Sequence, residues 1–67
     1  MQEHIQLEVS LEIIMAEIAN KMQELRNLKD ESKTKLLENQ LEDLIKLQEE
    51  AYKGDRKAVL KILNREF

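Results

Sequence analysis

The chain has 67 residues, of which 37% are charged, a net charge of −3, and neither cysteine, proline nor tryptophan. A chain of this length forms one domain at most, and its core is marginal unless a metal, a disulfide or a second subunit adds to it. The lack of cysteine excludes disulfides and thiolate metal sites, the acidic balance argues against a nucleic-acid-binding surface, and the helix-forming composition argues against a β-sandwich.

The first predicted element is a long amphipathic helix over residues 3–29. Its apolar residues recur at the i, i+3, i+4, i+7 spacing of a helix that buries one face. This main stripe consists of Leu7, Leu11, Ile14, Ile18, Leu25 and Leu28. We expect Met15 and Met22 to widen the main stripe as ordinary core residues.

The beginning of this segment also fits a β-strand. Residues 5–13 alternate between apolar and polar, which is the pattern of a strand with one buried face. The helix is favoured because the main stripe continues through Ile18, Met22 and Leu25, with no glycine or proline to change the structure.

A strand at residues 4–13 would give the chain an alternative function. A short strand followed by two helices resembles a ribbon-helix-helix repressor, whose paired strands enter the major groove of DNA. The polar face of that strand would consist of Gln6, Glu8, Ser10 and Glu12. The two carboxylates would repel DNA phosphates, so DNA binding is kept as the alternative only.

A second apolar stripe lies on nearly the opposite side of the predicted first helix and occupies only its N-terminal half. We call it the back stripe, and its members are Ile5, Val9, Ile13 and Ala16. A stripe of this kind must be covered to be stable. The back stripe is therefore the predicted protein interface, covered either by the third helix or by a second subunit.

The polar segment at residues 29–35 is predicted to contain a turn. On a continuous helix, Leu37 would lie about 180° from Leu28, because each residue advances by about 100°. The two apolar stripes would then need different partners. A turn with Asp30 or Ser32 as the N-cap brings them together in an antiparallel hairpin, and an uninterrupted rod of about 75 Å is the alternative.

The second helix is predicted over residues 33–53 and the third over residues 55–66. Gln48 lies in the apolar stripe of the second helix, where it either fixes the helix register or reaches solvent at the edge. Gly54 suits the left-handed position that ends a helix, and Asp55 suits the N-cap of the next helix.

Side chains that could carry chemistry are few. His4 has Glu8 at i+4, as metal ligands on a helix would, but a single histidine without cysteine is a poor zinc site. Adjacent carboxylates on a helix point about 100° apart and do not form a general acid and base pair. We therefore predict no catalytic, metal-binding or cofactor-binding residue, no small-molecule substrate, and a protein that is not an enzyme.

The sequence thus predicts an all-α domain over residues 1–67, in which a helical hairpin and a short third helix dimerise into a helical bundle. The predicted helix–helix core is Leu7, Leu11, Ile14, Ile18, Leu25, Leu37, Leu41 and Leu44. The expected function is that of a scaffold, adaptor or small regulator that binds a second copy or another protein. No nucleic-acid partner is expected for this acidic chain. No membrane partner is expected either, because no apolar run approaches the about 20 residues of a membrane span. The start of the chain lacks a basic segment ahead of an apolar run, so a cytoplasmic location is expected.

Overall fold

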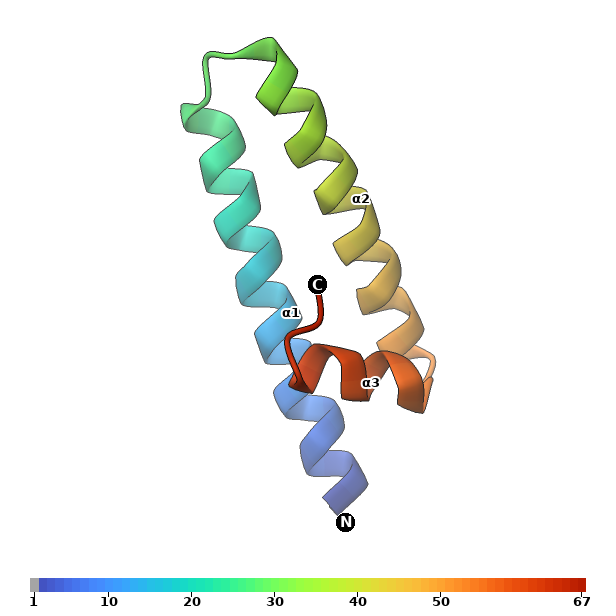
Figure 1. Cartoon of the computed structure of the whole chain (residues 1–67). Helices are drawn as coiled ribbons and strands as arrows, with labels where there is room; N and C mark the ends of the chain where they lie inside the picture. Colours follow the sequence, from blue (N-terminus) through green and yellow to red (C-terminus); the bar gives the residue numbers. More distant parts are fainter. Residues whose placement is uncertain (1) are drawn as a thin grey trace.

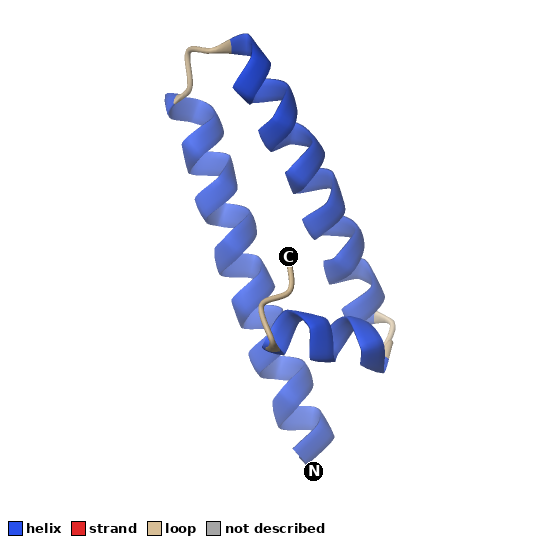
Figure 2. Cartoon of the chain, viewed as in Figure 1, coloured by secondary structure: helices blue, strands red, loops and turns tan. Residues whose placement is uncertain are grey.

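A computed structural model describes residues 2–67, with side chains from residue 4 onward. The described chain is all-helical and contains no strand (Figure 2). Its three helices are α1 (Gln2–Asn27), α2 (Glu31–Tyr52) and α3 (Arg56–Leu63). Residues 4–13 are part of α1, so the strand interpretation was wrong. The segment is helical despite its alternating pattern because the helical spacing of apolar residues continues into Ile14 and Ile18, which are both buried.

Helices α1 and α2 form an antiparallel hairpin, as Figure 1 shows. The molecule measures 45 × 17 × 15 Å, so the alternative of a rod of about 75 Å was wrong. Asp30 is the N-cap of α2, and its carboxylate accepts a hydrogen bond of 3.0 Å from the backbone N–H of Ser32. The hydroxyl of Thr34 donates to the backbone oxygen of Asp30 at 2.9 Å, within the same first turn. Capping by Asp30 starts α2 at Glu31, two residues before the predicted start.

The connection between α2 and α3 is a Schellman motif followed by a new cap. Gly54 has a φ of +86°. Its N–H bonds the carbonyl of Ala51, and the N–H of Asp55 bonds the carbonyl of Glu50, both at 3.0 Å. The carboxylate of Asp55 then accepts a hydrogen bond of 3.0 Å from the N–H of Lys57 at the start of α3.

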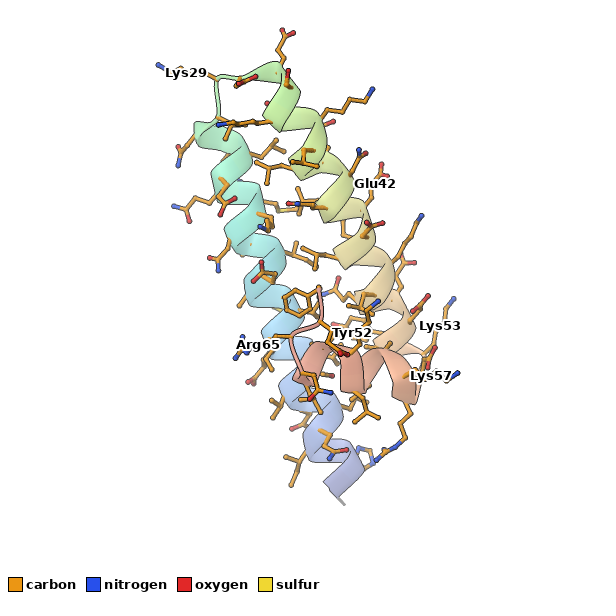
Figure 3. All side chains as sticks on the ribbon, in the orientation of Figure 1. Lys29, Glu42, Tyr52, Lys53, Lys57 and Arg65 are labelled. Carbon is orange, nitrogen blue, oxygen red and sulfur yellow. The ribbon has the colours of Figure 1, made fainter. Side chains whose placement is uncertain are left out.

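Helix α3 ends at Leu63, three residues before the predicted end. A second Schellman motif ends it, with Arg65 at a φ of +55°. The N–H of Arg65 bonds the carbonyl of Ile62, and the N–H of Glu66 bonds the carbonyl of Lys61, both at 2.9 Å. The chain therefore turns back at Arg65, and its end lies over the hairpin (Figures 1 and 3).

The hydrophobic core lies where α3 crosses one face of the hairpin (Figure 1). All three helices contribute to it, and Ile14 and Ile62 are fully inaccessible to solvent. The core cluster consists of Ile14, Ile18, Leu41, Leu44, Ala51, Ala58, Val59 and Ile62. Leu7, Leu11 and Leu25 are half-buried against this cluster, and Leu37 is buried outside it.

Ser10 is a buried polar residue of α1 with no exposed surface. Its hydroxyl donates a hydrogen bond of 2.7 Å to the backbone oxygen of Leu7, one turn earlier in the same helix. The hydroxyl thus needs no partner from another helix. A small side chain at this position suits the close packing around the crossing of α3.

Met15 and Met22 are more exposed than the sequence predicted. Met15 is 55% exposed and Met22 is 44% exposed, so they do not belong to the core of this chain. The reason is their angle on the helix, since both lie about 60–80° from Leu25, which faces α2. Gln48, for which two roles were open, is half-buried in the seam of α2.

Candidate interaction surfaces

Side chains of chemical interest are scattered over the surface. His4, Glu8 and Glu12 are all exposed. Among the described residues, no three histidine, aspartate or glutamate side chains gather as a possible metal-binding group. The ion pair of Lys21 with Glu17, at 3.9 Å, joins two partly exposed groups on one face of α1 and adds little stability. None of the helices in the described part has the length and apolar character to cross a membrane.

The back stripe is largely open in the single chain. Ile5 is 61% exposed, Val9 is 39% exposed, and Ala16 is exposed as well. Ile13 differs from them, because it is half-buried and packs against the core. Ser10, about 100° round the helix from Val9, is fully buried, so the flank of α1 beside the back stripe is covered within the chain. Within the single chain, the core thus reaches Ile13, whereas Ile5, Val9 and Ala16 stay exposed.

A second apolar surface lies on the side of the hairpin turned away from α3. We call it the open face, and it consists of Met15 and Met22 on α1 with Ile45 and Tyr52 on α2. Their exposed fractions are 55%, 44%, 37% and 61%, respectively. Each pair is one heptad apart, so its two members lie within about 20° on the same side of their helix.

Residues on the other side of α2 show where the open face lies relative to α3. Leu47 lines a groove together with Lys61 and Phe67, which belong to α3 and the segment after it. Ile45 precedes Leu47 by two residues and lies about 160° away from it on the helix. Helix α3 and Ile45 are therefore on opposite sides of the hairpin.

The groove between α1, α2 and the end of the chain has a volume of about 440 Å³. Leu44, Leu47 and Phe67 are the apolar residues among the eleven that line it. Seven of the others are charged, four acidic and three basic: Glu17, Asp43, Glu50, Glu66, Lys21, Lys46 and Lys61. Because the lining contains both signs in similar number, it indicates no particular class of ligand.

Sequence reasoning identified the back stripe but missed the open face. It assigned the methionines to the core and gave no role to Ile45 and Tyr52. The heptad spacing of the two pairs was the available signal. What the sequence could not show was that α3 lies on the opposite side and leaves both pairs uncovered.

Comparisons of the chain with protein-family models, with curated proteins and with solved structures found no match.

Proposed function

We propose that this protein is a non-enzymatic helical interaction module that self-associates through the back stripe of α1. It would act as a scaffold, an adaptor or a small regulator, and would hold a second protein through another helical surface. The cytoplasmic location expected from the sequence is part of this proposal. The observation that carries it is the exposure of Ile5 and Val9, two large apolar side chains one turn apart.

The size of the chain supports self-association. A domain of 67 residues gains little from its own core, and a second copy is a common way to bury more apolar surface. The back stripe on α1 can face the same stripe of a second copy across a two-fold axis, which is the usual symmetry of homodimers. Ala16 is small and would allow the two helices to approach closely.

The expected affinity is modest. Full burial of a valine or isoleucine side chain stabilises by about 1.5–3 kcal/mol, and Val9 and Ile5 are already partly covered. Association itself costs about 4 kcal/mol or more in lost freedom of motion. The free energy gained by burial and the free energy lost on association are thus of similar size. We therefore expect a dimer that dissociates on dilution.

Sedimentation velocity over a concentration series tests this proposal. The wild type is expected to shift from the chain mass of 8.0 kDa towards twice that mass as its concentration rises. The double variant Ile5→Ser/Val9→Ser is expected to stay at 8.0 kDa with unchanged helicity. Ile13 is left intact, because its contact with the core would confuse the result.

The matched control is Leu36→Ser/Leu60→Ser, which also removes two exposed apolar side chains, 58% and 41% exposed. This control is expected to dimerise as the wild type does. A wild type that remains monomeric at every concentration, or a double variant that still dimerises, would overturn self-association through the back stripe.

A further inference from the structure

The open face is an apolar surface that no helix of the described chain covers. It spans both helices of the hairpin, with Met15 and Met22 on one side of the seam and Ile45 and Tyr52 on the other. The opposite side of the same hairpin already holds a helix, because α3 packs there through Ala58, Val59 and Ile62. Methionine side chains are flexible and adapt to varied apolar partners.

The borders of the open face on α2 are acidic. Glu42 and Glu49 are the i−3 and i+4 neighbours of Ile45, and Glu38 lies two turns before it. All three are exposed, and Figure 3 shows Glu42 on the outer side of α2, away from α1. The lysines of α2 lie farther round, as Lys46 and Lys53 are about 80–100° from Ile45.

The border on α1 is acidic beside Met15 and basic beside Met22. Glu12 is the i−3 neighbour of Met15, Glu8 lies two turns before it, and both are exposed. Arg26, at i+4 from Met22, is the basic residue of this border. The open face is therefore bordered by carboxylates along α2 and beside Met15 on α1, and by Arg26 beside Met22.

We propose that the open face binds a basic amphipathic helix of another protein. Such a helix would lay its apolar side on Met15, Met22 and Ile45, and its flanking lysine and arginine side chains would face the carboxylates of α2 and those beside Met15. A second copy of this chain is a poorer occupant, because the same acidic borders would meet each other. This inference rests on the proposed function as an interaction module, but not on dimerisation through the back stripe.

The probes are three synthetic peptides of about 18 residues, the length of five helical turns. The first contains only leucine and lysine, with leucine at i, i+3, i+4 and i+7. The second is a scrambled peptide of the same composition, and the third keeps the leucine pattern but replaces each lysine by glutamate. Titrations followed by fluorescence anisotropy give the affinities, and NMR shifts of the methionine methyl groups and of the backbone amides give the site.

The amphipathic lysine peptide is expected to bind at least about tenfold more tightly than either control peptide, which corresponds to about 1.4 kcal/mol. The variant Met15→Ser/Ile45→Ser is expected to lose this preference. Glu42→Gln/Glu49→Gln is expected to weaken binding of the lysine peptide at low salt. Ile5→Ser/Val9→Ser, which tests the back stripe, is expected to bind as the wild type does.

Equal binding of the amphipathic and scrambled lysine peptides would overturn the inference, because it would reduce the contact to charge alone. Peptide-induced shifts confined to the groove beside Phe67 would also overturn it. Loss of dimerisation in Met15→Ser/Ile45→Ser would assign the open face to a second copy instead. Because sedimentation reports self-association separately, failure of peptide binding in a protein that still dimerises would remove this inference alone.

Discussion

Gly54 and Arg65 occupy the same position in two successive helix ends. Each is the left-handed residue of a Schellman motif, with φ values of +86° and +55°. Glycine adopts this conformation without steric cost, whereas a residue with a Cβ does not. The turn after α2 therefore has a residue that favours the left-handed conformation, and the turn after α3 has one that does not.

Arg65→Gly is expected to stabilise the protein. The left-handed conformation costs a non-glycine residue about 1–2 kcal/mol, and part of the gain is lost to the greater freedom of glycine in the unfolded chain. The net change in the free energy of unfolding should be about 0.5–1 kcal/mol, or a few degrees in Tm. Thermal unfolding followed by circular dichroism measures it.

A substitution of opposite effect at the other turn, Gly54→Ala, supplies the control for Arg65→Gly. A Cβ at Gly54 would meet no atom within 4 Å, so Gly54→Ala is expected to destabilise through its φ alone. The double variant Gly54→Ala/Arg65→Gly should have a free energy of unfolding close to that of the wild type. Stabilisation by Gly54→Ala would contradict this account of both turns.

Ile62→Ala is expected to cost about 2–5 kcal/mol of stability, because the side chain is fully buried and its loss leaves a cavity. A small domain has little more stability than this, so partial unfolding at room temperature is expected. Leu60→Ala on the same helix removes a side chain that is 41% exposed and should cost much less. Similar costs for the two, measured by urea unfolding, would show that α3 does not anchor the core.

Ser10 is expected to tolerate loss of its hydroxyl but not an increase in size. Ser10→Ala removes only a hydrogen bond to Leu7 within the same helix and gains helix propensity, so the change should stay within about 0.5 kcal/mol. Ser10→Leu overfills a position with no exposed surface and should cost about 1–3 kcal/mol. Urea midpoints of both variants check the contrast, and equal stability of Ser10→Leu and the wild type would refute close packing at this residue.

Gln6→Met is expected to stabilise α1. The side-chain oxygen of Gln6 is buried and has no hydrogen-bond partner, and such a group costs about 1–3 kcal/mol. Methionine has a similar length and removes the polar group. Gln23→Met, at an exposed position of the same helix, is the control and should be close to neutral. A urea midpoint of Gln6→Met below that of the wild type would contradict the expectation.

The all-helical fold and its turns could be anticipated because local signals carry them. Asp30, Gly54 and Asp55 are residues whose side chains or conformations favour one position at a helix end. The early end of α3 could not be anticipated in the same way, because Arg65 has no intrinsic preference for a positive φ. There the backbone hydrogen bonds of the turn outweigh the local preference.

The surfaces were harder to predict than the fold. A helical pattern shows which residues share a side, but not which side a third helix will cover. Met15 and Val9 are both apolar and both on α1, and each remains exposed because neither α2 nor α3 covers its side of the helix. The path of α3 depends on the packing of residues such as Ile14 and Ile62, which are far apart in the sequence.

The unequal coverage of the hairpin has a dynamic consequence. Helix α3 braces the end of the hairpin that contains the core, whereas near the turn α1 and α2 have only each other, and Leu25 and Leu28 stay half-exposed there. Regions with fewer buried contacts open at lower free energy than the rest of a domain. Backbone amides near the turn should therefore exchange with solvent deuterium through local separation of the two helix tips, while those beneath α3 exchange only when the whole chain unfolds.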